Sequence, residues 1–410
     1  MKQKLFWGIL AVGYLLLCIN SVNIGGDFDV YLHAAEKLSR GENIYDPPFL
    51  NGLKYYYSPF FALALTPFCQ QPFAIELFWL ILLGGMMLRV WQLIKYQFDT
   101  NIFSQRTLYL WTLLSFFFAL RFWLYNVAMI QVTIFLLWAM MESVHQLNKG
   151  RNIQAAGLLA LAINVKILPI VLLPYWLYRG RVKAVGWLCG FSMLLLYLPS
   201  LFLGQEQNAF LLAEWWEVIN PMNGEHLIET ETNAQSLVGL IPAYFMEMEG
   251  EFPFKRNWLN LSVAQVHQLT NLIRLLLIAL SLWFLGRPFQ KPRSSLAEFR
   301  ALAYMLMIVP LIFPHQQKYA FLFAYPMIAY LCYYCVLKWT HKRDRPFLLF
   351  GSALALCLLV FSPLVGADII GRYAYDLIHY FRLLSIATLG LVVLALLARP
   401  KHIEGIIAKL

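Results

Sequence analysis

The chain has 410 residues, of which 60% are hydrophobic and 13% are charged, and its formal net charge is +10 at pH 7. Soluble domains are about half apolar and about a quarter charged, so this composition excludes a water-soluble globular protein. Because the sequence lacks repeats and Pro/Ser-rich linkers, we expect an all-α polytopic membrane protein with a single integral membrane domain, residues 1–410.

Twelve apolar segments are predicted to cross the membrane, although several are shorter than the ~20 residues of a perpendicular span. Residues 20–23 do not fit a signal-peptidase site, so the first segment is predicted to be an uncleaved helix. Segments 153–165 and 167–178 are also compatible with one long broken helix. The twelve segments are 5–22, 73–94, 106–120, 124–143, 153–165, 167–178, 183–203, 262–285, 299–313, 319–338, 346–364 and 378–398.

The positions of the basic residues predict how these segments are oriented in the membrane. With the N-terminus inside, 21 of the 32 Lys and Arg residues lie on the inner side, together with five of the 22 acidic residues. Cytoplasmic loops collect Lys and Arg, so both termini are predicted to be cytoplasmic, in a bacterial plasma membrane. The net charge therefore reflects orientation, and no basic–aromatic pattern indicates a nucleic-acid partner. The two long loops, 23–72 and 204–261, are predicted to lie outside, where we expect any chemistry.

The first outer loop opens with two glycines followed by Asp27 and Asp29. Apolar residues then recur at the spacing of one helix face, from Tyr31 to Leu38, and Gly41 is a plausible stop. This pattern predicts a short amphipathic helix lying in the membrane interface. Each Asp has a purely structural interpretation, as helix cap or dipole partner. Their spacing also resembles the metal-and-nucleotide motif of soluble glycosyltransferases, but nucleotide sugars are cytoplasmic and this loop faces outward.

The second outer loop contains another predicted interfacial helix. Its apolar face consists of Leu211, Leu212, Trp215, Val218 and Ile219. Acidic and amide side chains follow, including Gln235 and the neighbouring Ser236. These groups either bind sugar hydroxyls or simply solvate the loop, and no ligand spacing indicates a metal.

Several ionisable or amide groups lie at the outer ends of predicted spans, where a charge is costly and is a functional candidate. Lys166 lies between two short segments, just ahead of Pro169. The alternative interpretation is snorkelling to lipid headgroups or pairing with loop acids. The other members of this set are Arg121 in a predicted 121–126 turn, Gln131 in the next span, His315 to Lys318 in a late turn, and Arg372 in the last turn.

These residues also resemble a known family. The stretches Asp27-Phe28-Asp29-Val30-Tyr31, Tyr45-Asp46-Pro47 and Tyr55-Tyr56-Tyr57-Ser58-Pro59 are similar to the signature of glycosyltransferase family 87. Weaker matches are Gln131, Lys166-Ile167-Leu168-Pro169, Gln235-Ser236-Leu237 and His315. The members of this family are mannosyltransferases of the GT-C class that use polyprenyl-phosphate donors.

The resemblance implies a GT-C-like fold and a mechanism. Asp27 would be the catalytic base of an inverting, metal-independent transfer of a hexose, mannose in the family, to a glycan or glycolipid acceptor on the outer face. The donor's phosphate or sugar would be bound by Lys166, His315, Lys318, Arg372 and Gln131, whereas the acceptor or its loop would involve Asp29, Tyr31, Tyr57, Gln235 and Ser236. The co-substrate would be a lipid-linked sugar, with no other cofactor and no nucleotide.

Two departures from the family pattern concern donor contacts. The usual Asn-Gln-Ser-Leu reads Asn233-Ala234-Gln235-Ser236-Leu237, and the usual pair of histidines reads His315-Gln316. The transferred sugar therefore need not be mannose. Two other functions remain open: a transporter or lipid flippase, which the broken pair at Lys166 favours, and a non-catalytic assembly subunit.

Overall fold

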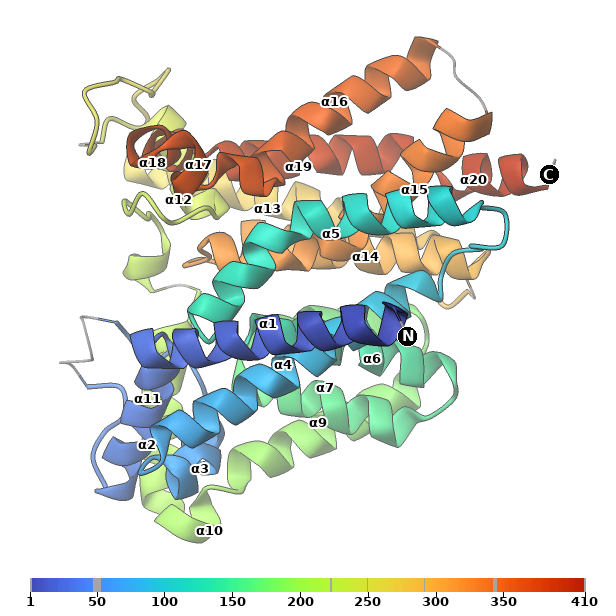
Figure 1. Ribbon diagram of the computed structural model, residues 1–410. Helices are drawn as coiled ribbons and strands as arrows, with labels where there is room; N and C mark the ends of the chain where they lie inside the picture. The colour runs from blue at the N-terminus through green and yellow to red at the C-terminus, as the bar shows by residue number, and fades with distance from the viewer. Residues whose placement is uncertain are drawn as a thin grey trace. The chain divides into compact units, whose positions relative to one another are not determined.

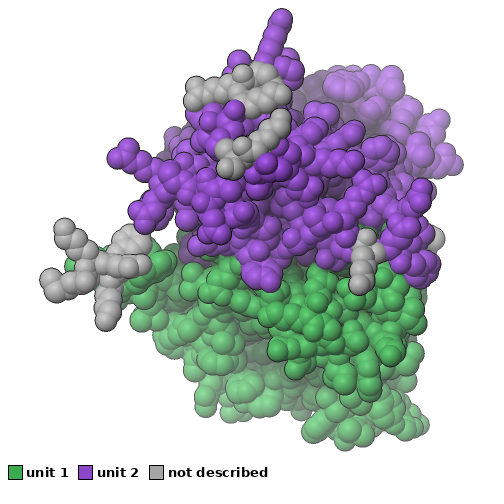
Figure 2. Space-filling model, turned by 90° about the vertical axis from the view of Figure 1, so that its right-hand side faces the viewer, with its two compact units in different colours: residues 1–93, 124–223 green, residues 94–123, 224–410 purple. Residues whose placement is uncertain are grey.

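The computed structural model describes residues 2–46, 53–221, 223–248, 250–290, 292–341 and 345–408; Pro47 of the first motif lies outside them. Over these ranges the chain is helical, which confirms the all-α class (Figure 1). The chain divides into two compact units. Unit 1 comprises residues 1–93 and 124–223, and unit 2 comprises residues 94–123 and 224–410 (Figure 2).

Most helices of unit 1 are apolar segments connected by short turns. α6 packs on α7, and α7 packs on α9, whereas α2 packs on α3 (Figure 1). The helices of this unit are α1 (Lys2–Ile24), α2 (Phe28–Ser39), α3 (Pro59–Leu65), α4 (Pro72–Lys95, its last two residues in unit 2), α6 (Thr133–Asn148), α7 (Asn152–Val165), α8 (Leu172–Tyr178), α9 (Val182–Tyr197), α10 (Ser200–Leu203) and α11 (Gln205–Ile219), with 3₁₀ turns at Thr66–Phe68 and Leu168–Val171.

Unit 2 is built around α14 and the segment formed by η5 and α15. Of their most apolar windows, 78% and 94% respectively are buried inside the protein, so these helices form a core rather than a lipid-facing surface. The helices are α12 (Leu237–Phe245), α13 (Val263–Leu285), α14 (Ser295–Ile312), η5 (Lys318–Ala324), α15 (Tyr325–His341), α16 (Arg345–Phe361), α17 (Ala367–Ile370), α18 (Arg372–Tyr380), α19 (Leu383–Leu397) and α20 (Pro400–Ile407), with η4 at Gly224–His226 and η6 at Pro363–Val365.

The helices support an integral membrane protein but not the predicted count of twelve spans. Seven described helices are long and apolar enough to cross a bilayer, or eight if α18 and α19, which are bent by 58°, form one span. Outer helices such as α13 expose large apolar side chains, including Leu272, Leu275 and Trp283. Contiguous apolar surface of this kind is stable against lipid tails and costly in water.

The predicted turn at 121–126 is wrong. A single helix, α5 (Gln105–Ala128), continues through Arg121, and the break falls at residues 129–132. Gln131 therefore lies in a turn before α6 rather than inside a span. The Arg121 side chain is accommodated within the helix because its guanidinium lies 5.3 Å from the centre of the Phe122 ring and donates to the Val360 carbonyl. A buried cation with these contacts does not require a turn.

The predicted break at Lys166 is confirmed. Helix α7 ends at Val165, and Lys166 adopts an extended conformation with φ −147° and ψ 134°. Pro169 cannot donate a hydrogen bond to the Val165 carbonyl, so an α-helix cannot continue through it. The chain resumes as a 3₁₀ turn followed by α8.

Both predicted loop helices are present as α2 and α11. In α2 the predicted face is buried, and Gly41 follows the helix with φ +73°. In α11, Leu211 and Trp215 are buried, whereas Leu212, Val218 and Ile219 are half-buried. Helices α3 and α12 were not predicted from the sequence. Helix α3 begins at Pro59, where Ser58 accepts from Phe61 N and provides the cap.

Candidate functional site

The chain around Asp27 is fixed by close backbone contact with the turn that precedes α6. Asp27 N donates to the Met129 carbonyl at 2.9 Å. A Cβ added to Gly26 would lie 2.6 Å from that same carbonyl oxygen, so only glycine permits the approach. Gly25 has φ +79° and directs the chain from α1 into α2. The two glycines thus set Asp27 against residues 129–131.

The two aspartates have different partners. The Asp27 carboxylate accepts a hydrogen bond from Gln131 Nε2 and makes no cap bond to α2. Asp29 Oδ2 instead accepts from Gly26 N at 3.0 Å and so braces the turn before the helix. The structural interpretation therefore fits Asp29, whose side chain stabilises the start of α2. The Asp27 side chain makes no such bond to the helix.

Lys166 and two tyrosines complete this group, which we name the carboxylate cluster: Asp27, Asp29, Tyr31, Tyr57, Glu76, Gln131 and Lys166. The hydroxyls of Tyr31 and Tyr57 lie 2.7 Å apart, and the Tyr31 hydroxyl donates to Gln131 Oε1 at 3.5 Å. Lys166 Nζ lies 5.2 Å from the centre of the Tyr57 ring. Ser58 donates to the Asn164 carbonyl at the end of α7, which holds the tyrosine segment beside Lys166.

Burial and charge shift the two central pKa values toward neutrality. Burial raises the pKa of Asp27, although the Lys166 ammonium and the Gln131 amide lower it in part. Burial lowers the pKa of Lys166 to about 8, against the opposing attraction of Asp27. Two ionisable groups with pKa values moved toward the working pH are typical of acid–base sites.

Glu76 is a member of this cluster that the sequence analysis missed. It lies in the first turns of α4, its side chain is buried, and its carboxyl group interacts with that of Asp29. Glu76 is an isolated acid within the apolar sequence of α4. An ionisable residue in an apolar helix is a candidate for function, so this pattern could have identified it.

In unit 2, Gln235 and Ser236 hold a loop against a turn. Gln235 N donates to the Gln316 carbonyl at 2.9 Å, and Gln235 Nε2 donates to the His379 carbonyl at 3.1 Å. The Arg382 guanidinium donates to the Ala234 carbonyl from the other side. Both Gln235 and Ser236 are fully buried. Hydrogen bonds from the backbone and the side chain of Gln235 thus connect three segments that are distant in sequence.

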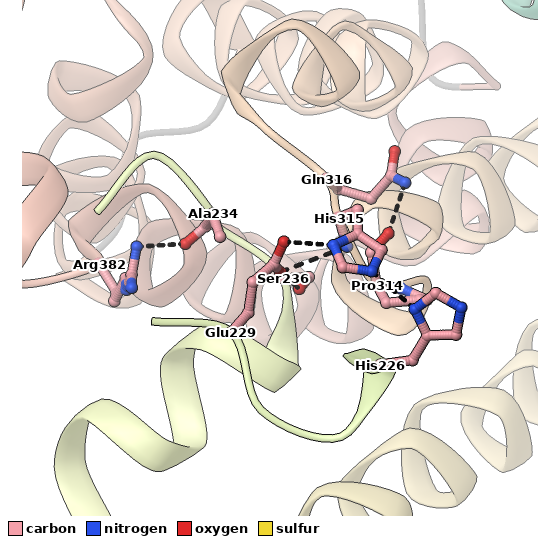
Figure 3. Close-up of polar contacts among 8 residues, drawn as sticks. All are labelled: His226, Glu229, Ala234, Ser236, Pro314, His315, Gln316 and Arg382. Atoms are coloured by element: carbon pink, nitrogen blue, oxygen red, sulfur yellow. Dashed lines mark hydrogen bonds and ion pairs between the residues drawn. The ribbon is translucent and has the colours of Figure 1, made fainter. Parts of the chain in front are cut away.

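His315 lies on that turn, between a carboxylate and a second imidazole (Figure 3). Its Nδ1 is 2.8 Å from Glu229 Oε1, and its Nε2 is 2.6 Å from His226 Nδ1. Glu229 Oε2 also accepts from the Ser236 hydroxyl and from His315 N, both at 3.3 Å. The second imidazole comes from η4, 89 residues before His315, so no local pattern in the sequence indicated this pairing.

Cations surround Tyr375 in the same unit. Lys318 Nζ donates to its hydroxyl at 2.6 Å and lies 5.1 Å from its ring centre. The guanidinium groups of Arg121 and Arg372 lie 5.8 Å and 6.0 Å from the same ring centre. Arg372 is mostly exposed and pairs with Asp376 at 2.7 Å. We name Glu229, His226, His315, Lys318, Arg121, Tyr375 and Arg372 the imidazole–cation cluster.

The structure thus distributes the predicted site residues over both units. Asp27, Asp29, Tyr31, Tyr57, Gln131 and Lys166 lie together in unit 1, whereas Gln235, Ser236, His315, Lys318 and Arg372 belong to unit 2. Among the described residues, no three His, Cys, Asp or Glu side chains are arranged to hold a metal ion.

Comparisons with known proteins agree with the resemblance. The sequence model of glycosyltransferase family 87 matches residues 55–314, which include Tyr57, Gln131, Lys166, Gln235 and Ser236 but neither Asp27 nor His315. A similar solved structure is ArnT from Cupriavidus metallidurans bound to undecaprenyl phosphate. It is 15% identical, with a TM-score of 0.37, over 96% of this chain and 77% of that one. No curated protein matches the chain.

Proposed function

The chain belongs to glycosyltransferase family 87, and from this premise we propose that it transfers a hexose, with mannose as the first candidate, from a polyprenyl-phosphate donor to a glycan or glycolipid acceptor. The reaction takes place on the extracytoplasmic face of a bacterial plasma membrane, with both chain termini in the cytoplasm. The donor's lipid phosphate is the leaving group, so no nucleotide is required. In this proposal the protein's own cations, and not a metal, stabilise the departing phosphate.

The observation that carries the proposal is the environment of Asp27. Its carboxylate is held by an amide, caps no helix, and has a raised pKa beside a lysine. A base acts best when its pKa approaches the working pH, since it must be ionised and still bind a proton strongly. Asp27 therefore serves as general base, and Gln131 orients its carboxylate.

The transfer balances without any additional reagent. Asp27 takes the proton of an acceptor hydroxyl as that oxygen attacks the anomeric carbon. The bond between this carbon and the phosphate oxygen breaks on the opposite side, so the anomeric configuration inverts. The released polyprenyl phosphate gains one negative charge, which cations stabilise.

Each unit has basic residues that we assign to phosphate binding. They are Lys166 in unit 1, and Lys318 and His315 in unit 2. Arg121 joins this set because its guanidinium lies against the ring that Lys318 contacts. Arg372 is the weakest candidate, since its guanidinium would have to break its ion pair with Asp376 in order to bind a phosphate. Tyr31 and Tyr57 place hydroxyls beside Gln131, where they suit contacts with the sugar or the acceptor.

The test is sugar transfer by the purified protein in lipid nanodiscs. Polyprenyl-phosphate [¹⁴C]mannose and a bacterial glycolipid extract are supplied, and labelled product and released polyprenyl phosphate are measured. We expect both to appear in equal amounts, with none formed from a nucleotide-activated mannose. Product from the nucleotide sugar alone would refute the donor class. Movement of the lipid-linked sugar across proteoliposomes without any product would favour the transporter or flippase instead.

A further inference from the structure

A cavity of unit 1 lies at the ends of α4, α6 and α7 that are remote from the carboxylate cluster. All of its lining residues belong to this unit, and its volume is about 450 Å³, within the range of small-molecule binding sites. α6 begins just after Gln131 and α7 ends just before Lys166, so these two helices connect the cluster to the cavity. The cavity is therefore separate from the site described above.

An ion pair between α4 and α6 forms one wall of the cavity. Arg89 donates to both oxygens of Glu142, from Nε at 2.8 Å and from Nη2 at 3.3 Å. Gln146, one turn further along α6, also donates to this carboxylate through Nε2. The side chain of Glu142 is 9% exposed, whereas that of Arg89 is 37% exposed. The protein's own donors thus occupy the carboxylate, and a ligand reaches the guanidinium.

A second guanidinium lies on the other side of Gln146. Arg151, an exposed residue at the start of α7, donates from Nη1 to Gln146 Oε1 at 3.2 Å. This bond to a neutral amide leaves the charge of Arg151 uncompensated. Two guanidinium groups and one occupied carboxylate give the cavity a net positive charge. Guanidinium groups bind phosphate oxygens with paired hydrogen bonds, so a phosphate is the ligand that this charge favours.

The apolar lining residues indicate that the phosphate belongs to a lipid. Trp138 and Leu158 line the cavity from the inner parts of α6 and α7, whereas Gln146 and Arg151 lie near the helix ends. Leu161 shares a face of α7 with Leu158 and is 36% exposed. The lining thus changes from charged to apolar toward the middle of the helices, as a phospholipid does from its headgroup to its acyl chains.

We propose that this cavity binds the headgroup of an anionic phospholipid, phosphatidylglycerol or one of similar charge, in the leaflet opposite the carboxylate cluster. The turn that holds Arg151 is on the side predicted to be cytoplasmic, and basic pockets between membrane helices on that side hold anionic headgroups in other proteins. A zwitterionic lipid suits the cavity less, because the Glu142 carboxylate is not available to its ammonium group. The inference requires only that the chain spans a membrane, and it does not depend on sugar transfer.

The experiment titrates phosphatidylglycerol into the delipidated full-length protein in detergent micelles and measures the bound lipid by native mass spectrometry. Phosphatidylethanolamine is the zwitterionic reference, and glycerol 3-phosphate represents the headgroup without acyl chains. We expect phosphatidylglycerol to bind about tenfold more tightly than phosphatidylethanolamine, the scale of one charge-assisted hydrogen bond. Equal affinity for the two lipids would overturn the inference. Glycerol 3-phosphate binding as tightly as phosphatidylglycerol would also overturn it, by showing a site for free phosphate.

Variants locate this binding at the cavity. Arg151→Gln should weaken phosphatidylglycerol binding about tenfold, whereas Arg106→Gln, at an exposed position of α5 outside the cavity, should change it little. Glu142→Gln keeps an oxygen for Arg89 but removes the negative charge, so it should strengthen the binding several-fold. Equal losses in the two arginine variants, or weaker binding in Glu142→Gln, would contradict the assignment. Thermal unfolding midpoints show that the compared variants are folded.

Discussion

The carboxylate cluster of unit 1 and the imidazole–cation cluster of unit 2 are both assembled from distant segments, yet their charges differ. In the first, two aspartates and Glu76 accompany a single buried lysine. In the second, three cations lie around the Tyr375 ring, namely Lys318, Arg121 and Arg372. Its carboxylate, Glu229, contacts the His315 ring. An acidic group with a raised pKa is suited to accept a proton, whereas clustered cations are suited to hold an anion.

The largest effect should follow from Asp27→Asn, which keeps the shape of the side chain and removes the base. We expect kcat to fall by about 10²–10⁴-fold, the usual contribution of a general base. Asp29→Asn is the matched control. Because Asp29 accepts from Gly26 N and braces the turn, its loss should lower stability more than turnover. Single-turnover transfer assays and thermal unfolding of both variants measure this, and wild-type turnover in Asp27→Asn would rule out the assigned base.

The next effect concerns the cations of unit 2. Lys318→Met removes the ammonium that contacts the Tyr375 hydroxyl. We expect the donor's kcat/KM to fall by about tenfold or more, because a charged contact to the phosphate is lost. Lys255→Met, at an exposed position of the same unit, should change it little. Initial rates over a range of donor concentrations decide this, and equal effects in the two variants would argue against a phosphate role for Lys318.

The pH dependence of turnover tests the coupling between Asp27 and Lys166 in unit 1. Turnover should rise with pH as Asp27, whose pKa is raised, loses its proton. It should fall again above about 8 as Lys166 loses its own. In Lys166→Met the alkaline limb should disappear. The acid limb should move to higher pH, since the ammonium no longer lowers the pKa of Asp27. Rate profiles from pH 5 to 10 test this, and an acid limb moving to lower pH would contradict the coupling.

The smallest effect is expected for Tyr57→Phe. This substitution removes the hydroxyl that lies 2.7 Å from Tyr31 but keeps the ring beside Lys166. Loss of one buried hydrogen bond should cost about 1 kcal/mol of unfolding free energy and change turnover only a few-fold. Tyr109→Phe, on an exposed ring, should alter neither quantity. Denaturation monitored in detergent micelles provides the measurement, and a complete loss of activity would indicate that the hydroxyl takes part in the chemistry.

Local patterns in the sequence predicted much of the fold. Apolar runs located most of the helices, Pro169 located the break at Lys166, and helical spacing located α2 and α11. The error at Arg121 came from treating a buried cation as a turn signal. Its packing on Phe122 is a tertiary contact that hydropathy does not record. The true break contains Ile130, whose φ is +49°. A β-branched residue rarely adopts a positive φ, so its presence in the sequence does not predict a turn.

The site was predictable only in part, for the same reason. Asp27, Gln131 and Lys166 were singled out separately, and the structure brings them together in one cluster. The partners of His315 were not, because Glu229 and His226 lie 86 and 89 residues away, and neither stands in a motif. Glu76 was not predicted, although an isolated acid in an apolar helix is a recognised indication of a functional residue.

The outward placement of the Asp27 segment can be tested most directly by labelling single cysteines in intact cells. In a background without the six native cysteines, Glu42→Cys reports on the loop that follows α2, and Arg151→Cys reports on the turn before α7; both positions are exposed. We predict that a membrane-impermeant maleimide labels residue 42 without permeabilisation and labels residue 151 only after it. The reverse pattern would place Asp27 in the cytoplasm and contradict transfer on the outer face.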